Sequence, residues 1–246
     1  MMRALGTTGL QVTDLGFGGA GIGGLYVAVG RDAAMTAMQA AWDEGMRYFD
    51  TAPFYGFGLS ERRVGDFLRD KSGYVLSTKV GKMLRAVPQD QVPDHGFVGP
   101  LPFAVDFDYS YDAVMRSYEF SLARLGLNKI DILYVHDLEK RNLGAAYDAH
   151  FSRFMDGGLK ALKSAGAIAG FGLGVNEVSA VLAVIDRVKL DCLLLAGRYT
   201  LPDRTGGVCQ RSCPPISCGV SDFRGADFVF GVEPDGSGGL PVPGFA

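Results

Sequence analysis

Short apolar runs alternate with amphipathic segments along residues 14–201 of the chain. Helical patterns at 31–44, 60–68, 111–125, 151–165 and 177–188 separate six strand-like runs, at 14–18, 46–50, 74–78, 130–136, 167–173 and 191–195. Strands that alternate with helices are typical of a parallel sheet covered by helices. The pattern therefore predicts six strand–helix steps without the sixth helix, preceded by a small hairpin that turns at residues 7–9.

Capping and turn residues mark the ends of several of these elements. Ser60 and Ser110 are good N-caps for the helices they precede, and Gly126 ends the second of these helices. Residues 81–109 contain four prolines and are predicted to form a long loop, which in a compact domain is usually functional or mobile. One buried face of helix 111–125 is predicted from the spacing of Tyr111, Val114, Met115, Tyr118, Leu122 and Leu125.

Polar side chains stand where three of the predicted strands end. Asp50 ends the second strand with Tyr55 just beyond it, Lys79 follows the third strand, and His136 ends the fourth. The carboxyl ends of parallel strands in a barrel meet on one face, so these side chains are expected to share one site. Taken singly, Lys79 fits a structural ion pair and His136 fits a core histidine. Their joint position at strand ends favours a catalytic set.

Such a set suits hydride transfer coupled to proton exchange. A free tyrosine has a pKa near ~10, and an ammonium group beside Tyr55 is expected to lower that pKa by stabilising the phenolate. In this interpretation Asp50 holds Lys79 in place, and His136 orients the substrate oxygen by hydrogen bonding. The hydride itself comes from, or goes to, a cofactor.

Composition argues against several other classes of protein. The chain has 246 residues, of which 48% are hydrophobic and 21% charged, and this is enough for one large α/β domain. A net charge of -3 gives no indication of nucleic-acid or membrane binding, and we expect neither partner. The sequence shows no signal peptide and no apolar run long enough to span a bilayer, so a cytoplasmic location is expected.

Two local patterns look like known motifs and are set aside. Residues 16–21 match G-x-G-x-x-G after a strand, but a dinucleotide-binding fold needs a helix at the third glycine, and here the helix starts near Arg31. We expect these glycines to allow close backbone approach to a ligand or a tight strand exit. Cys209, Cys213 and Cys218 lack the C-x2-C spacing of common zinc sites, so no metal site is expected.

Five segments together resemble the aldo-keto reductase family. They are RALGTTGL at 3–10, FDTAPFYG at 49–56, STKVG at 77–81, SLARLG at 121–126 and DILYVHD at 131–137. Residues 107–112 and 196–200 are most similar to the branch of bacterial L-fucose and D-threo-aldose 1-dehydrogenases and pyridoxal 4-dehydrogenase. The resemblance implies a TIM-type (β/α)8 barrel, NAD or NADP as cofactor, and a sugar-like or pyridoxal-like small molecule as substrate.

The resemblance also implies roles for the residues at the strand ends. Tyr55 matches the general acid/base of the family, Lys79 and Asp50 match the pair that tunes it, and His136 matches the residue that orients the substrate.

Cofactor-binding positions follow from the same resemblance. Gly18 and Gly19 match the exit of the first strand beside the nicotinamide, and Asp50 borders the same site. Asn176, after the fifth strand, matches the residue that holds the nicotinamide amide.

The strand–helix pattern stops after residue 201, where glycine, proline and cysteine break every window. Val175 and Ala196 replace the Ser and Gln that the family often has, and its seventh and eighth strands, which carry the pyrophosphate site, are not recognisable. We therefore divide the chain into an incomplete barrel at 1–201 and an irregular tail at 202–246, with a short predicted strand at 228–230. The tail fits an out-of-frame translation, and the product is expected to be poorly soluble or partly folded.

The expected function is that of an NAD(P)-dependent dehydrogenase acting on an aldose or a pyridoxal-like substrate. The intact set of Tyr55, Lys79, Asp50 and His136 favours this function. The alternative is an inactive barrel with a binding or regulatory role, or none, which the missing cofactor-binding end favours. Both NAD and NADP are retained as cofactors, and no oligomeric state is predicted.

Overall fold

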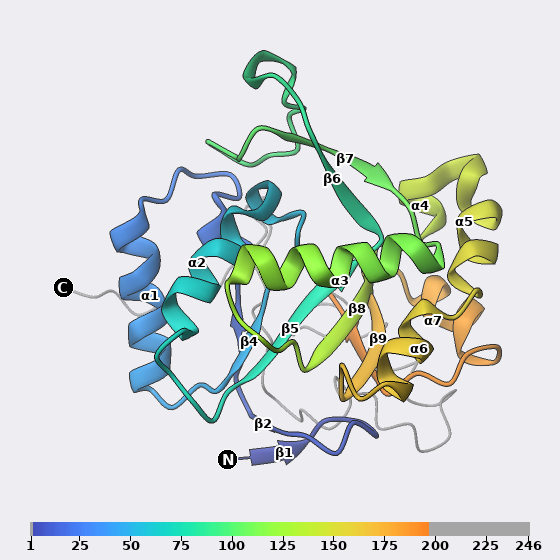
Figure 1. Ribbon diagram of the computed structural model, residues 1–246, viewed down its shortest axis with the longest axis horizontal. Helices are drawn as coiled ribbons and strands as arrows, with labels where there is room; N and C mark the ends of the chain where they lie inside the picture. Colours follow the sequence, from blue (N-terminus) through green and yellow to red (C-terminus); the bar gives the residue numbers. More distant parts are fainter. Residues whose placement is uncertain (1, 197–246) are drawn as a thin grey trace.

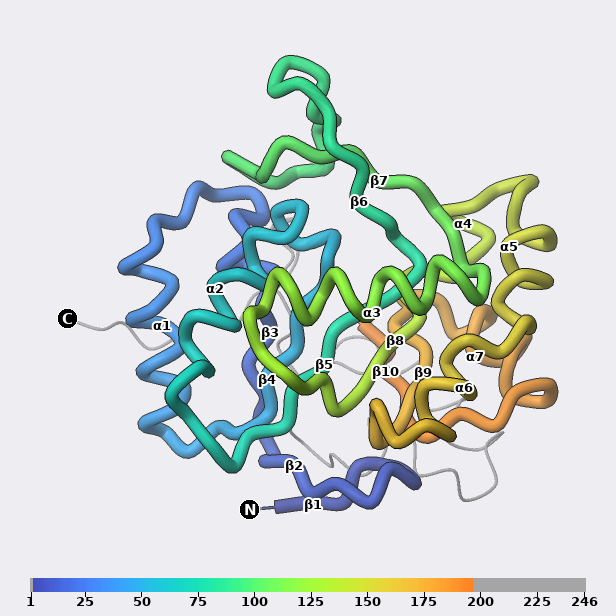
Figure 2. Tube along the Cα trace, viewed as in Figure 1, coloured from blue at the N-terminus to red at the C-terminus, as the bar shows by residue number. Residues whose placement is uncertain are grey.

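A computed structural model describes residues 2–196 of the chain (Figures 1 and 2). Its main sheet has six strands in the order β10-β9-β8-β5-β4-β3, and every neighbouring pair is parallel. The strands are β3 (Phe17–Gly18), β4 (Tyr48–Asp50), β5 (Val75–Val80), β8 (Ile132–His136), β9 (Gly170–Val175) and β10 (Cys192–Leu195). All six predicted strands are confirmed, and together they form part of a β/α barrel.

Helices cover the outer face of this sheet. They are α1 (Arg31–Asp43), α2 (Leu59–Leu68), α3 (Tyr111–Leu125), α4 (Lys140–Leu143), α5 (Tyr147–Phe154), α6 (Gly158–Ser164) and α7 (Val178–Ile185). In Figure 1, α1, α2 and α3 lie side by side, and each contacts the next. The main core lies between helices and sheet, where Leu68, Leu76 and Leu133 are fully buried.

A second, smaller core fills the inner face of the sheet. Tyr48 of β4 and Ile132 and Tyr134 of β8 point there and are almost fully buried. The predicted small hairpin, β1 (Met2–Ala4) and β2 (Gln11–Thr13), is confirmed and contributes Val12 to this core. Because both faces of the strands are buried, these strands have the near-continuous apolar sequences of a parallel sheet.

The region predicted as one long loop contains a hairpin instead. β6 (Lys82–Ala86) pairs with β7 (Phe103–Phe107) in antiparallel register. The four prolines of this region all lie between the two strands, where they do not interrupt the ladder. In Figure 1 the hairpin projects from the end of the sheet at which β5 and β8 end.

Three predicted helix details are wrong. Ser60 does not cap α2, because its hydroxyl donates to the Gly19 carbonyl and pairs with Thr51. The single helix predicted at 151–165 is two helices, broken at Gly157, whose φ of 86° is left-handed. On α3 the predicted cap Ser110 and the terminal Gly126 are confirmed, but Tyr111 is 42% exposed rather than part of the buried face.

The predictions for residues 197–246, including the tail boundary at residue 202, the strand at 228–230 and the cysteine cluster, lie outside the described residues. Within the described part, no helix is both long and apolar enough to cross a membrane.

Candidate active site

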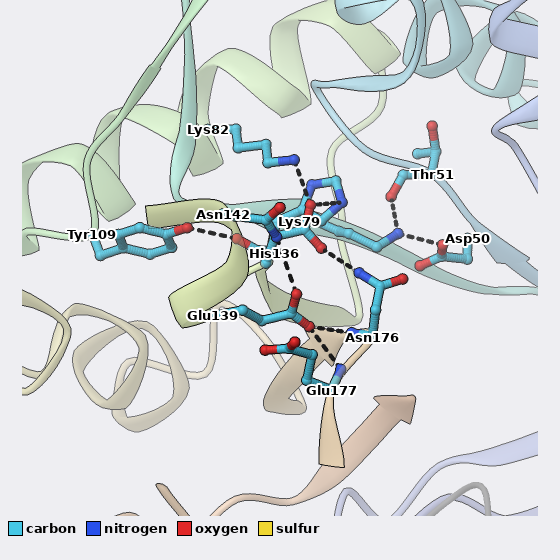
Figure 3. Close-up of polar contacts among 11 residues, drawn as sticks. Asp50, Thr51, Lys79, Lys82, Tyr109, His136, Glu139, Asn142, Asn176 and Glu177 are labelled. Atoms are coloured by element: carbon cyan, nitrogen blue, oxygen red, sulfur yellow. Dashed lines mark hydrogen bonds and ion pairs between the residues drawn. The ribbon is translucent and has the colours of Figure 1, made fainter. Parts of the chain in front are cut away.

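The side chains predicted from the strand ends meet at one end of the sheet, where Figure 3 shows Asp50, Lys79 and His136. Lys79 Nζ lies 2.5 Å from Asp50 Oδ2 and 4.7 Å from the centroid of the Tyr55 ring. The His136 ring is perpendicular to that of Tyr55, with centroids 5.8 Å apart. Residues up to 86 positions apart in the sequence, from Asp50 to His136, therefore share one site, as the sequence pattern predicted.

The Lys79–Asp50 ion pair is almost completely buried, with 2% and 1% of the side chains exposed. Lys79 Nζ also donates to the Thr51 carbonyl at 3.0 Å, and Asp50 Oδ1 accepts from Ser77 Oγ at 2.6 Å. Burial on its own disfavours the ammonium, but Asp50 and Tyr55 together outweigh it and raise the pKa of Lys79. Lys79 is therefore a fixed positive charge beneath the Tyr55 ring.

The pKa of Tyr55 moves in the direction opposite to the one expected from sequence. Burial raises this pKa by more than the nearby Lys79 charge lowers it. The lowering effect of Lys79 is present, as predicted, but burial is the larger contribution. The Tyr55 residue as a whole is half-buried, and its hydroxyl is consequently protonated at neutral pH and suited to donating a proton.

His136 is a neutral imidazole in this site. Burial sets its pKa well below 6.5, since only 6% of the residue is exposed. Its Nδ1 atom is buried and has no hydrogen-bond partner among residues 2–196. A neutral imidazole carries one donor and one acceptor nitrogen, so His136 is able to hydrogen-bond a small polar group beside Tyr55.

Aromatic side chains pack beside these residues. The ring of Phe54 lies 5.8 Å from that of His136 and 5.4 Å from that of Phe97. Phe97 in turn lies 6.4 Å from Tyr55. Phe97 comes from the segment between β6 and β7, as does His95, whose ring lies 5.4 Å from that of Phe54, and neither was identified from the sequence.

Gly18 and Gly19 lie next to Asp50, as the sequence predicted for a strand exit. Gly18 pairs in register with Asp50, and the Gly19 amide donates to the Asp50 carbonyl at 2.8 Å. A Cβ atom on Gly19 would lie 2.5 Å from Ser60 Oγ and 2.9 Å from that carbonyl, so only glycine fits. Residues 16–21 were not expected to be a dinucleotide-binding motif, and the structure agrees. Such a motif needs a helix at its third glycine, whereas α1 begins only at Arg31.

Asn176 follows β9 and is held by two carboxylates that sequence reasoning missed. Its Nδ2 donates to Asp137 Oδ1 at 3.1 Å, and its backbone amide donates to Glu139 Oε1. Asp137 also pairs with Lys82, whose Nζ lies 2.5 Å from Oδ2. Charged residues just after a strand and at the start of a hairpin look solvent-exposed in sequence, and only the fold brings them together.

No cluster of three or more His, Cys, Asp or Glu residues suited to a metal ion occurs between residues 2 and 196.

Comparisons with known proteins agree with this fold. A model described as the Aldo/keto reductase family matches residues 14–205. Pyridoxal 4-dehydrogenase of Microbacterium luteolum is 46% identical over 216 residues, covering 82% of this chain and 63% of that protein. D-threo-aldose 1-dehydrogenase of a Pseudomonas species is 37% identical over 204 residues, covering 80% and 60% respectively.

The fold is also similar to that of solved structures. The holo form of an aldo-keto reductase from Bacillus halodurans matches with a TM-score of 0.60 and 25% identity, over 78% of this chain and 56% of that one. The predicted incomplete barrel of this family is thus confirmed for the described residues. The chain spans about 60% of the length of the two curated relatives named above, at 63% and 60%.

Proposed function

Because the chain belongs to the aldo/keto reductase family, we propose that it is an NAD(P)-dependent oxidoreductase that interconverts a carbonyl and an alcohol. The single observation that carries this proposal is the arrangement of Tyr55 above the buried Lys79–Asp50 pair and beside a neutral His136. A structural ion pair alone would not require a tyrosine hydroxyl and an unpaired imidazole nitrogen at the same place.

In the reducing direction Tyr55 donates its hydroxyl proton to the substrate oxygen, which becomes an alcohol. The phenolate left behind is stabilised by Lys79, whose ammonium lies 4.7 Å from the ring centroid. Asp50 keeps Lys79 charged and in place through the 2.5 Å contact. His136 hydrogen-bonds the same substrate oxygen and orients the carbonyl. In the oxidising direction the Tyr55 phenolate takes the proton of the substrate hydroxyl. An aldose or pyridoxal is oxidised in its cyclic hemiacetal form, whose hydroxyl-bearing carbon loses a hydride and becomes a lactone carbonyl.

The described residues fit the nicotinamide end of NAD or NADP, which supplies or accepts the hydride when bound. Asn176 is the candidate for holding the carboxamide. Asp137 fixes its side-chain amide and Glu139 fixes its backbone amide, close to the Lys79–Asp50 ion pair (Figure 3). Gly18 and Gly19 keep the backbone free of side chains next to Asp50. These residues would hold the reactive end of the cofactor.

The substrate is proposed to be an aldose similar to L-fucose or a pyridoxal-like aldehyde. The two curated relatives are named for pyridoxal and D-threo-aldose substrates. The rings of Phe54 and Phe97 near His136 and Tyr55 support either choice, because aromatic faces pack against flat heterocycles and against the apolar faces of sugars.

A non-catalytic barrel with a binding or regulatory role, or none, is the second candidate. It is favoured by the departures from the family pattern at Val175 and Ala196, where the family often has Ser and Gln.

Cofactor reduction by the 246-residue chain tests both candidates. NAD and NADP are each assayed with L-fucose, D-arabinose and pyridoxal, and cofactor binding is measured separately by fluorescence. We expect Tyr55→Phe to lower kcat by about 10²–10⁴-fold with little change in cofactor affinity. Tyr111→Phe, on the exposed side of α3, is the matched control and should behave as wild type.

The outcomes separate the two candidates. Turnover that survives Tyr55→Phe would show that another group moves the proton. Cofactor binding without turnover of any of the three substrates would favour the non-catalytic barrel.

A further inference from the structure

A second buried ion pair lies beside the catalytic set. Lys82 begins β6 and Asp137 follows β8, and their Nζ and Oδ2 atoms are 2.5 Å apart with 6% and 15% of the side chains exposed. The Lys82 ammonium also lies 3.8 Å from the centroid of the Phe54 ring. Neither Lys82 nor Asp137 has a role in the chemistry proposed for Tyr55.

Asp137 uses its two oxygen atoms for different partners. Oδ2 accepts a hydrogen bond from the Lys82 ammonium, and Oδ1 accepts one from Asn176 Nδ2 at 3.1 Å. Glu139 secures the backbone at the same place, because Oε1 accepts from the amides of Asn176 and Glu177. The segment after β8 therefore holds Asn176 by both its main chain and its side chain.

An ionised carboxylate accepts hydrogen bonds but donates none. The side-chain amide of Asn176 must therefore turn its NH2 group toward Asp137. Its oxygen must then point away from Asp137. Figure 3 shows this arrangement, with the Asn176 oxygen directed toward the side of Lys79 and Asp50. The ionisation of Asp137 thus determines which end of the Asn176 amide faces the site.

Lys82 provides the charge that keeps Asp137 ionised. Burial favours the neutral carboxyl, but positive charge beside it lowers the pKa of Asp137 below its usual range. His136, Lys82 and Lys79 all lower this pKa, but His136 is neutral at pH 7, and of the two lysines Lys82 is the one in direct contact with Asp137, at 2.5 Å. Replacing this lysine should free Asp137 to take up a proton and to become a donor.

We propose that Asp137, held by Lys82, is a positioning residue that fixes the Asn176 amide so that its oxygen accepts from the NH2 group of the nicotinamide carboxamide. This inference rests on the proposed function, because it assumes that the nicotinamide binds beside Asn176. It assigns to the Lys82–Asp137 pair an effect on cofactor recognition rather than on proton transfer.

Asp137→Asn is the most informative replacement. Asp137 has a φ of 52°, and Asn is among the residues that tolerate this left-handed conformation best. The new side chain is able to donate as well as accept, so Asn176 could then adopt either amide orientation. Lys82→Met removes the charge instead and should act in the same direction.

Binding of two cofactors distinguishes orientation from simple stability. Affinities are measured by fluorescence for NADH or NADPH and for the matching acetylpyridine dinucleotide, in which a methyl group replaces the carboxamide NH2. We expect wild type to prefer the nicotinamide form by about tenfold, and Asp137→Asn to reduce this preference to about threefold or less. Asp106→Asn, in an exposed ion pair on the same hairpin, should keep the wild-type preference.

A double-mutant cycle adds a second reading. Asn176→Ala should abolish the preference, and adding Asp137→Asn to it should then change nothing further. If Asp137→Asn retains the wild-type preference, or weakens both dinucleotides equally, the inference is overturned while the proposed function stands. If wild type binds neither dinucleotide, the proposed function fails and the inference fails with it.

Discussion

The buried Lys79–Asp50 pair allows a quantitative test of how the site is stabilised. Lys79→Met removes the donor to Asp50 and to the Thr51 carbonyl, whereas Asp50→Asn leaves a buried ammonium with that carbonyl and the Tyr55 ring. We expect each single replacement to lower the free energy of unfolding by about 3–5 kcal/mol, because it leaves an uncompensated buried charge. The double replacement leaves no buried charge and should lower the free energy of unfolding by no more than either single replacement does. The coupling energy between Lys79 and Asp50 is then about 3–5 kcal/mol.

Urea unfolding followed by tryptophan fluorescence measures these energies. Trp42, the single tryptophan, is partly buried and packs against the core with its ring 6.1 Å from that of Phe49, so its emission reports on the folded sheet. The exposed pair Arg85–Asp106 is the matched control, with 60% and 52% of the side chains exposed and an expected coupling below about 1 kcal/mol. If the two single costs simply add in the Lys79–Asp50 double variant, the argument from burial is wrong.

Three further predictions concern stability. Burial keeps His136 neutral with a pKa well below 6.5, so the free energy of unfolding should fall by up to about 1.4 kcal/mol for each pH unit below 6.5. In urea unfolding, His136→Gln should show a shallower fall of this free energy with decreasing pH, and equal slopes would contradict the prediction. A Cβ atom on Gly65 would lie 1.8 Å from the Leu125 carbonyl, so Gly65→Ala should lower the free energy of unfolding by about 3 kcal/mol or more. Gly30→Ala, in open space at the N-cap of α1, should cost about 1 kcal/mol or less, and similar melting temperatures for the two variants would refute this. Ser110→Ala should cost about 1 kcal/mol in thermal unfolding through loss of the α3 cap, and Ser110→Thr should restore most of it.

The six strands could be predicted because a parallel sheet buried on both faces leaves unbroken apolar runs. All six positions of β5, Val75–Val80, are buried, and their polar members sit next to specific partners. The β6–β7 hairpin was missed because its strands alternate less clearly and carry the exposed Arg85 and Asp106. The sequence predicts one helix at 151–165, and only the left-handed backbone of Gly157 shows that the helix breaks there.

Some features of the site could likewise be predicted from the sequence, and others depend on the fold. A lysine at the end of an apolar strand needs a buried partner, and this made the Lys79–Asp50 pair predictable. The direction of the Tyr55 pKa shift was not predictable, because it depends on how much protein surrounds the hydroxyl. Lys82 and Asp137 escaped notice because their contact joins a hairpin to a strand end 55 positions away.

The strand order of the sheet has a consequence for how the chain folds during synthesis. Neighbours in the sheet follow one another in the sequence, from β3 to β10, so each new strand adds to the edge left by the previous one. Because domains tend to form from the N-terminal side as the chain emerges, Asp50 and Lys79 are expected to pair before His136 is made. The docking of β9 then places Asn176 against Asp137 as the last of these contacts. Assembly of the site would thus be sequential, and arrested nascent chains ending before and after residue 176 should differ in protease resistance.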